Sequence, residues 1–181
     1  MTIHLETERL LLRELVASDA DRLFLLDSNP EVMKYVGMKP LKKVEETLEV
    51  IKMIRQQYAD NGIGRFAVVE KSSGLLIGWC GLKFISYEIN GHQNIYELGY
   101  RLLPEFWGKG YATESAKAWL EYGFGNRGTD IIYAYVDIEN TASVHTLEKL
   151  GFKNKGNFED SGDICTWYEL RKEDFDLKNK G

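Results

Sequence analysis

The sequence predicts one mixed α/β domain whose sheet has about seven strands and is flanked by about four helices. The chain has 181 residues, a length typical of a single domain with a buried core. Strand-like and helix-like segments follow one another in the order β-α-α-β-β-β-α-β-α-β-β, which favours a sheet that is antiparallel at first and parallel later. The parallel part is expected around Gly108 and Gly110, where an apolar run leads into a helical pattern.

The first half of the chain is expected to form the antiparallel part of the sheet. Val44, Leu48 and Ile51 recur at helical spacing, and Gly62 is a natural end for that helix. Ser18 is the expected N-cap of an earlier helix. The predicted elements are a strand at Arg9–Glu14, helices at Ser18–Leu26, Glu31–Tyr35 and Val44–Ala59, and strands at Arg65–Glu70 and Leu75–Tyr87.

The second half of the chain alternates strands with helices and then closes with two strands. Asn90 and Gly91 predict a turn before the first of these strands. No linker or repeat divides the chain, so residues 1–181 are expected to form a single domain, with a frayed tail at Lys178–Gly181. The predicted elements are strands at Ile95–Leu103 and Ile131–Val136, helices at Tyr111–Phe124 and Thr141–Leu150, and strands at Phe152–Phe158 and Ile164–Leu170.

Composition and charge narrow the classes of function. The formal net charge of −5 argues against a nucleic-acid partner and mildly favours cationic partners such as amines. The opening stretch MTIHLETERLLL has no basic region, and no window is apolar enough to span a membrane, so we expect a cytoplasmic protein without a membrane partner. Cys80 and Cys165 are expected to be buried, reduced thiols. Three scattered histidines and no paired acidic cluster predict no metal site.

The stretch PEFWGKGYATESA, which begins at Pro104, is the most informative part of the chain. Its two glycines permit a positive φ, and the backbone N–H groups at the start of the next helix can then bind an anion such as a pyrophosphate. Gly110 is followed by Tyr111 rather than lysine, and Thr113 stands where a dinucleotide-binding loop has its third glycine. Neither a P-loop nor a Rossmann loop therefore fits. From this stretch alone, a plain glycine turn that opens a helix remains the alternative.

The turn resembles the (Q/R)-x-x-G-x-(G/A) loop of the GNAT superfamily of N-acyltransferases, which holds the pyrophosphate of coenzyme A. Gly110 and Ala112 occupy two of the motif positions, and Trp107 stands where the family usually has arginine or glutamine. Downstream, Asn140–Phe152 reads NTASVHTLEKLGF and resembles the second coenzyme A motif of the same superfamily. In this helix Asn140 or Thr141 is the expected N-cap.

The start of the chain, Leu5–Leu15 and Ser18–Gly37, resembles one branch of this superfamily, the ribosomal-protein-alanine N-acetyltransferase-like group of the RimJ/RimL type. The resemblance extends from about Leu5 to about Phe175. It implies a GNAT fold, in which a strongly twisted mixed sheet is split like a V near the cofactor.

The resemblance also implies which residues bind acetyl-CoA. The strand before the glycine turn would contact the pantetheine arm through its backbone, the loop N–H groups would bind the pyrophosphate, and Asn140 would contact pantetheine or a bridging water. Ordinary sheet pairing is the alternative for the strand positions, and a purely capping role is the alternative for Asn140. The implied cofactor-binding residues are Arg101, Leu102, Leu103, Trp107, Gly108, Lys109, Gly110, Tyr111, Ala112, Thr113 and Asn140.

Glu97 is the candidate general base, because it is the carboxylate on the strand that precedes the glycine turn. Family members often place a base on this strand, and a desolvated glutamate can have a raised pKa, as a base for an ammonium substrate requires. The alternative is that Glu97 faces solvent or pairs with Arg101, which lies on the same face of the strand.

Ser143 is the candidate general acid. Many relatives have a tyrosine seven residues after the motif asparagine, but Leu147 stands there in this chain. The RimJ/RimL-type branch is similar in placing a serine three residues after Asn140, near the cofactor sulfur. The alternative for Ser143 is a hydrogen bond that caps the helix.

These observations lead us to expect an N-acetyltransferase that moves an acetyl group from acetyl-CoA to a primary amine by direct attack. The acceptor is either a protein N-terminus, as the branch implies, or a small-molecule amine. The alternative from another class is a non-catalytic acyl-CoA-binding or regulatory module on the same fold, which the missing tyrosine and Trp107 favour. The assembly is expected to be a monomer or a homodimer.

Overall fold

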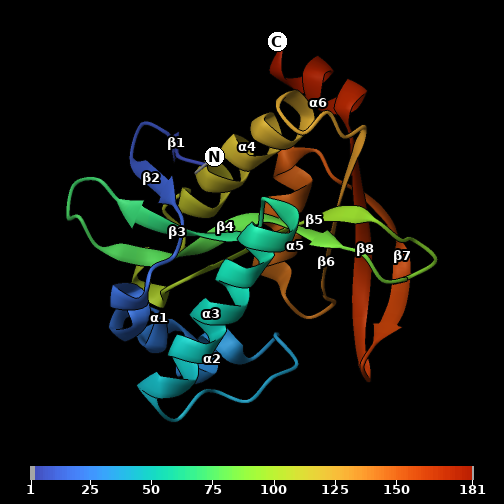
Figure 1. The fold of residues 1–181 in the computed structure, drawn as a ribbon. Helices are drawn as coiled ribbons and strands as arrows, with labels where there is room; N and C mark the ends of the chain where they lie inside the picture. The colour runs from blue at the N-terminus through green and yellow to red at the C-terminus, as the bar shows by residue number, and fades with distance from the viewer. Residues whose placement is uncertain (1–2, 181) are drawn as a thin grey trace.

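The computed structural model of the chain describes residues 3–180 and contains one eight-stranded mixed sheet (Figure 1). The strand order is β1-β2-β3-β4-β5-β6-β8-β7, and β5 and β6 are the parallel neighbours. This confirms the predicted fold class. The strands are β1 (Leu5–Glu6), β2 (Leu10–Arg13), β3 (Arg65–Glu70), β4 (Leu76–Ile85), β5 (Ile95–Leu102), β6 (Ile131–Asp137), β7 (Lys153–Asp160) and β8 (Asp163–Arg171).

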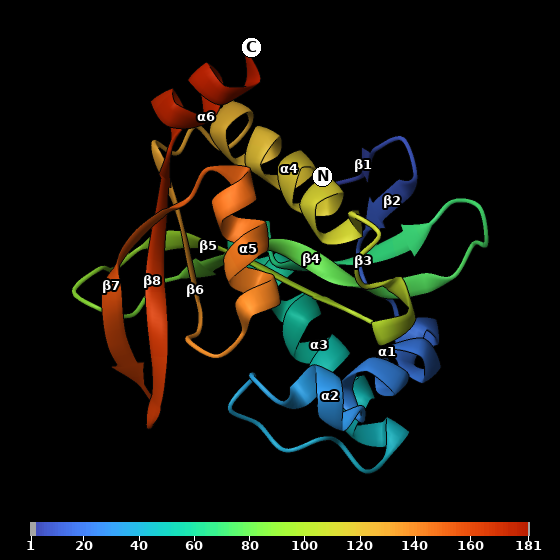
Figure 2. The same cartoon turned by 180° about the vertical axis from the view of Figure 1, so that it is seen from behind.

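Helices cover both faces of the sheet. Helices α1, α2 and α3 lie on the face that is in front in Figure 1, and α4 and α5 lie on the face that is in front in Figure 2. The α-helices are α1 (Ala20–Asp27), α2 (Pro30–Met33), α3 (Val44–Asn61), α4 (Tyr111–Gly125), α5 (Thr141–Leu150) and α6 (Lys172–Asn179), and short 3-10 helices span Ala17–Asp19 and Pro104–Phe106.

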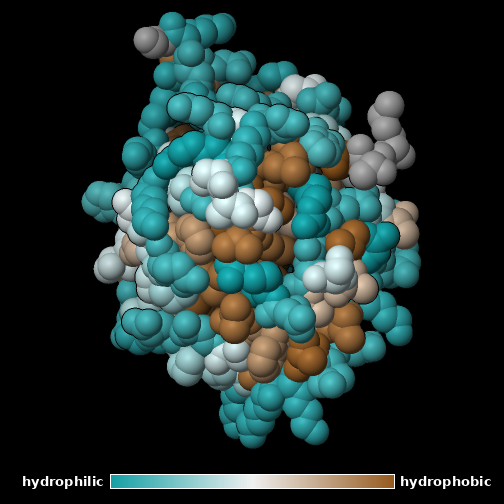
Figure 3. Space-filling view, turned by 90° about the vertical axis from the view of Figure 1, so that its left-hand side faces the viewer, coloured by the Kyte–Doolittle hydropathy of each residue, from teal (hydrophilic) through white to brown (hydrophobic). Residues whose placement is uncertain are grey.

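Each face of the sheet has its own apolar core. Leu23 of α1 and Ile51 of α3 are buried in the cluster beneath the first three helices. Trp119 of α4 and Leu147 of α5 are buried in the larger cluster on the opposite face, which also includes Phe175 of α6. Figure 3 shows the outer surface at the left of Figure 1, where hydrophobic residues gather in the middle of a largely hydrophilic face.

The sheet opens between its two parallel strands. β4 and β5 are paired along their whole shared length, from Ile85 opposite Ile95 to Gly78 opposite Leu102. β5 and β6, in contrast, are in register only at Glu97 and Tyr133. Beyond that point β5 follows β4 while β6 follows β8, so the second half of β5 faces an opening instead of a neighbouring strand. The structure therefore has the V-shaped split that the resemblance implies.

One local expectation needs correction, and the structure has two elements more than predicted. Ser18 does not cap the first helix, because it lies inside the 3-10 turn and Asp19 accepts a hydrogen bond from the Val16 N–H at 2.9 Å. The two-residue strand β1 and the helix α6 were not predicted from the sequence. Lys178, where the expected frayed tail begins, lies in α6 and donates from Nζ to the Lys149 carbonyl at 2.5 Å, while Gly181 lies outside the described residues. The fraying itself stays a prediction.

Other local expectations hold. Gly62 ends α3 and Gly151 ends α5, with φ angles of +65° and +99° that favour glycine. Within residues 3–180, no helix combines the length and the apolar character needed to cross a bilayer.

Candidate functional site

A cleft of about 780 Å³ opens where β5 and β6 separate. Its walls come from α2 with the loop after it, Arg65 of β3, parts of β4 and β5, the glycine loop before α4, and β6 with the start of α5. The tips of β7 and β8 complete the rim through Asp160 and Asp163. Every predicted site residue except Leu103 and Lys109 lines this cleft, so the structure brings the two coenzyme A motifs together.

The glycine loop presents a row of free backbone donors to the cleft. Gly108 and Gly110 have φ angles of +69° and +82°, and Gly110 is the residue that precedes α4. The first helical hydrogen bond runs from the Glu114 N–H to the Gly110 carbonyl at 3.0 Å. Among the described residues, none of the six N–H groups from Gly108 to Thr113 donates to a protein acceptor. A doubly charged anion such as a pyrophosphate fits this arrangement.

The space beside the loop is also open. A Cβ atom added to Gly108 would have no atom of the described protein within 4 Å. The loop therefore leaves room for an anion to approach its backbone closely, which is the use of glycine in phosphate-binding turns. The residues present at this site fit the diphosphate of acetyl-CoA.

Arg9, a residue that the sequence analysis did not single out, holds the loop from the other side. Its side chain bonds Glu114 of α4, with Nε to Oε2 at 2.7 Å, and donates from Nη1 to the Lys109 carbonyl at 2.9 Å. Its guanidinium also lies over the Tyr111 ring, 4.3 Å from the centroid. Thr7 adds a hydrogen bond of 2.6 Å to Glu114. The start of the chain thereby fastens the first turn of α4.

The hydrogen bonds from Arg9 and Thr7 to Glu114 have an electrostatic consequence. Glu114 places a negative charge in the first turn of α4, where bound phosphates would be repelled. Burial tends to raise the pKa of Glu114, but the bonds from Thr7 and Arg9 outweigh it and leave that pKa lowered. The carboxylate is therefore ionised, and the Arg9 guanidinium compensates its charge beside the loop.

The Trp107 side chain provides no polar contact for an anion bound in the loop. Its indole N–H donates to the Leu102 carbonyl at 2.7 Å, and the residue is 47% exposed. The side chain therefore ties the loop to the end of β5. An anion bound in the loop depends on the backbone N–H groups.

The end of β5 is only partly available to a cofactor. The Leu103 N–H donates to Ile77 and the Leu103 carbonyl accepts from Phe106, both at 2.9 Å. The predicted contact between Leu103 and the cofactor is therefore not supported, because both of its backbone groups are used within the protein. Arg101 and Leu102 remain at the wall of the cleft, although the Leu102 carbonyl is used by Trp107.

Glu97 reaches the cleft but forms an ion pair with Arg65 of β3. The expected alternative, a pair with Arg101 on the same strand, is wrong. Arg65 also donates from Nη1 to the Gly81 carbonyl at 2.7 Å and to the Glu97 carbonyl at 3.0 Å. Arg65, Gly81 and Gly99 are in register across three strands, and a Cβ at Gly99 would lie 2.5 Å from Arg65 Nη2. Because Gly99 has no side chain, the Arg65 side chain can cross the sheet at this point and reach Glu97.

Arg101 instead pairs with Asp27 at the end of α1, with Nη1 to Oδ1 at 2.8 Å. The Arg101 guanidinium lies over Trp79, the residue opposite it on β4, at 4.9 Å from the ring centroid. Burial raises the pKa of the Asp27 carboxyl despite the pair, and burial lowers the pKa of the Arg101 guanidinium. Two buried ion pairs therefore form the floor of the cleft on the side of α1 and α2.

The start of α5 forms the opposite wall. Asn140 caps this helix, as predicted, by accepting a hydrogen bond from the Ser143 N–H at 3.1 Å. The side chain that caps the helix is therefore that of Asn140, whereas capping was the alternative role considered for Ser143. Ser143 lies at the cleft wall. The Tyr100 hydroxyl of β5 donates to the Ser143 carbonyl at 3.2 Å and links β5 to α5 across the opening. Burial raises the pKa of Tyr100, so this hydroxyl is a donor.

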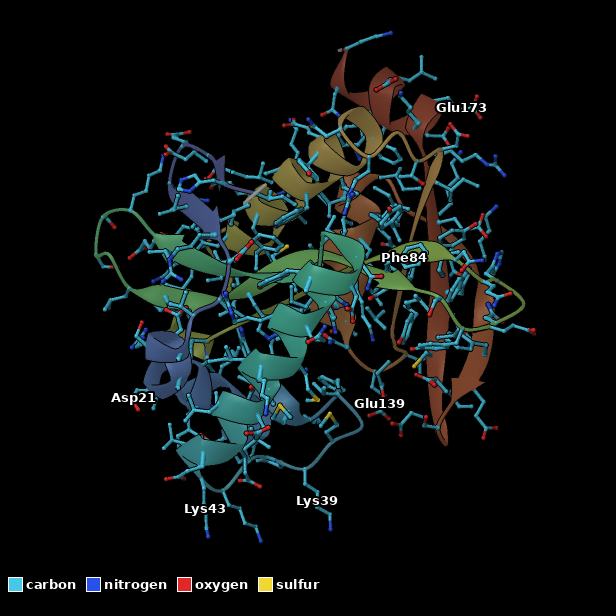
Figure 4. All side chains as sticks on the ribbon, viewed as in Figure 1. Asp21, Lys39, Lys43, Phe84, Glu139 and Glu173 are labelled. Carbon is cyan, nitrogen blue, oxygen red and sulfur yellow. The ribbon has the colours of Figure 1, made fainter. Side chains whose placement is uncertain are left out.

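The charged residues that line the cleft include the aspartates Asp137, Asp160 and Asp163 and the lysines Lys83 and Lys149. Asp137 ends β6, and Glu139 follows it in the turn that Figure 4 shows beside the loop carrying Lys39. Lys34 at the end of α2 has a raised pKa, first because of a hydrogen bond with Tyr35 and further because of Glu139 and Asp137. Among residues 3–180 there is no group of three side chains that could hold a metal ion.

Comparison with known proteins agrees with this geometry. Residues 9–153 match the acetyltransferase (GNAT) domain family. An uncharacterized N-acetyltransferase, p20, of Bacillus licheniformis is 37% identical over 156 residues, which cover 86% of this chain and 85% of p20. A spermidine N(1)-acetyltransferase of Vibrio cholerae is 30% identical over 172 residues, 95% of each chain. The crystal structure of a Vibrio cholerae spermidine N-acetyltransferase with CoA and spermine aligns with a TM-score of 0.74, at 26% identity, over 93% of this chain and 99% of that one.

Proposed function

Because the chain belongs to the GNAT family of acetyltransferases, we propose that it transfers the acetyl group of acetyl-CoA to a primary amine by direct attack on the thioester. The observation that carries this proposal is the row of six N–H groups from Gly108 to Thr113 that have no acceptor among the described residues, and all of these residues except Lys109 line the cleft between β5 and β6. The family uses acetyl-CoA, and the loop has the donors and the space for its diphosphate.

In this proposal the protein mainly positions the two reactants, and such positioning can supply much of the rate of a two-substrate reaction. Acetyl-CoA supplies an activated acyl group. The loop from Gly108 to Thr113 binds the diphosphate, and the open edge of β5 holds the pantetheine arm. The new C–N bond forms as the C–S bond breaks, so the amine must lose a proton and the leaving sulfur must gain one.

Glu97 and Ser143 are the proposed proton-transfer groups. Glu97 lies at the cleft, and its ion pair with Arg65 holds the carboxylate at one place on the floor. In this role it accepts the proton of the amine, directly or through a water. Ser143 faces the cleft from the first turn of α5, and its hydroxyl would donate to the leaving thiolate. Because Asn140 caps the helix, the Ser143 hydroxyl is available for this role.

The acceptor is proposed to be a protein N-terminus or a small-molecule amine. The resemblance to the RimJ/RimL-type branch supports the first, and the similarity to spermidine acetyltransferases supports the second. The three aspartates that line the cleft, Asp137, Asp160 and Asp163, would attract either kind of amine. A cytoplasmic location, a monomeric or homodimeric state and the absence of nucleic-acid and membrane partners stay predictions.

The test is an acetyl-transfer assay with the purified full chain, acetyl-CoA and a panel of amines. The panel contains spermidine, free amino acids, an aminoglycoside and short peptides with a free N-terminus. Release of CoA together with a product heavier by one acetyl group supports the proposal. Release of CoA in the absence of any acetylated product, or no release with any amine, contradicts it.

A further inference from the structure

The two faces of β5 serve different parts of the cleft. Successive residues of a strand point to opposite faces, so Tyr100 and Arg101 diverge. Tyr100 reaches α5, on the side of the glycine loop, whereas Arg101 reaches Asp27 of α1 and Met33 of α2. The acetyl donor is proposed to enter along the first side. The floor at Arg101 therefore faces the space left for the acceptor.

The Arg101 guanidinium is held rigidly in this floor. Asp27, which is only 5% exposed at its side chain, accepts from Nη1 at 2.8 Å, and the sulfur of Met33 lies 3.4 Å from the same nitrogen. Trp79 supports the flat face of the guanidinium. A side chain fixed on three sides has already lost the rotamer freedom that binding would otherwise remove.

Part of the guanidinium remains unused and accessible. Among the described residues, only Nη1 of Arg101 has a partner, so Nε and Nη2 donate to no protein group. Elsewhere Arg22 Nη2 and Arg127 Nε also have no partner, but those nitrogens are sealed from solvent. Arg101 is different, because its side chain is 18% exposed and lines the cleft. Two donors in a fixed fork that open onto a partly desolvated cleft are the arrangement that binds a carboxylate.

Stability does not account for this arrangement. Burying an ion pair is often no better for stability than burying apolar side chains of similar size. Here there are two such pairs, Arg101 with Asp27 and Arg65 with Glu97, and both guanidinium groups lie over the ring of Trp79. The Arg65 guanidinium compensates the charge of the Glu97 carboxylate, so the open fork does not face an uncompensated negative charge on its own strand.

We propose that Arg101 binds a carboxylate of the acceptor, so that the acceptor is a small zwitterionic amine of the amino-acid class. This inference rests on the proposed function and narrows its acceptor. The fork at Arg101 takes the carboxylate, and the three aspartates of the cleft, Asp137, Asp160 and Asp163, attract the amino group. Polyamines, which have no carboxylate, leave the fork unsatisfied.

The first experiment compares α-amino acids with their own carboxamides as acceptors. Both are presented to the full chain at saturating acetyl-CoA, and kcat/KM is measured for each. The carboxamide has the more readily deprotonated amine, so intrinsic reactivity cannot produce a preference for the acid. We expect the acid to be preferred by about 10- to 100-fold, the effect of a lost charge-assisted hydrogen bond. A preference for the carboxamides, for spermidine or for peptide N-termini overturns the inference.

The second experiment replaces the fork. Arg101→Lys keeps a positive charge beside Asp27 but removes the two open donors, and it should bring the ratio of acid to carboxamide close to one. The implied contact of residue 101 with acetyl-CoA is through its backbone, which the substitution keeps, so the dissociation constant for acetyl-CoA should not change. Arg13→Lys is the control, because Arg13 also pairs with a carboxylate, that of Asp19, but through two hydrogen bonds and away from the cleft. It should keep the preference of the unchanged protein.

A double variant covers the case in which Arg101→Lys does not fold. Arg101→Gln with Asp27→Asn removes both charges together and leaves no buried ion without a partner. It should also lose the preference for the acid, and an undiminished preference in either variant overturns the inference. If acetyl-CoA binds and other amines are acetylated with no role for Arg101, only the acceptor class is wrong. If acetyl-CoA does not bind at all, the proposed function itself fails.

Discussion

Replacing Gly108 by alanine tests the phosphate-binding role of the loop with a matched control at Gly128. Both glycines have a positive φ, +69° and +65°, and at neither would an added Cβ atom have an atom of the described protein within 4 Å. Gly108 lies in the loop before α4 and lines the cleft, whereas Gly128 lies in the turn between α4 and β6. The two substitutions therefore impose the same backbone conformation on alanine at two different places.

The stability effects of the two substitutions should be equal. Holding an alanine in the left-handed region costs about 1–2 kcal/mol. For a chain of this size, that lowers the melting temperature by about 2–8 °C. Either variant should therefore remain folded and bind ligands normally, unless the new methyl group occupies the ligand site.

The affinity for acetyl-CoA should differ between the two variants. At an acetyl-CoA concentration of about 100 times the dissociation constant, binding stabilises the unchanged protein by about 2.7 kcal/mol. If the methyl group of Gly108→Ala weakens binding tenfold, this gain falls to about 1.4 kcal/mol at the same concentration. Titration calorimetry with acetyl-CoA measures the change directly. Equal dissociation constants for Gly108→Ala and Gly128→Ala would refute the assignment of the loop.

Three further predictions concern separate parts of the protein. Ser143→Ala should lower kcat by about two- to tenfold, with little change in acetyl-CoA affinity, and an unchanged kcat would remove Ser143 from the proton transfer. Arg9→Gln should weaken acetyl-CoA binding about two- to fivefold by exposing the charge of Glu114 to the loop, and a second change, Glu114→Gln, should restore part of the affinity measured by calorimetry. Burial raises the pKa of Cys80 to about 12 and that of Cys165 to about 11. The unfolded chain therefore releases these protons first as the pH rises, and the free energy of unfolding should fall above about pH 9 by up to about 1.4 kcal/mol per pH unit for each thiol. Urea unfolding at pH 8 and pH 10 that gives equal free energies would contradict this.

Periodicity and capping chemistry were sufficient to predict most of the fold. The long helix that Gly62 ends and the cap at Asn140 are local features, so the residues that form them are close in the sequence. The strand β1 and the helix α6 were missed for the opposite reason. β1 has only two residues, and α6 is a polar helix that a single buried side chain, Phe175, attaches to the core. Elements of this kind exist because of tertiary contacts, which the local pattern does not contain.

In the candidate site, too, local features could be predicted from the sequence and tertiary contacts could not. The glycine loop could be predicted, because its donors belong to consecutive residues. The partner of Glu97 could not, because Arg65 reaches it over Gly81 and Gly99 only when three strands are in register. Alternation along one strand indicated Arg101 instead. The contribution of Arg9 was hidden in the same way, since it lies 100 residues from Lys109 in the loop that it holds.

The measurement that tests the central claim most directly is a thermal unfolding titration of the unchanged protein with acetyl-CoA, with ATP and NAD as controls. A ligand that binds only the folded state raises the melting temperature by mass action. The loop geometry predicts a saturable rise with acetyl-CoA that neither control reproduces. No rise at millimolar acetyl-CoA, or an equal rise with ATP or NAD, would contradict the claim that this cleft holds acetyl-CoA.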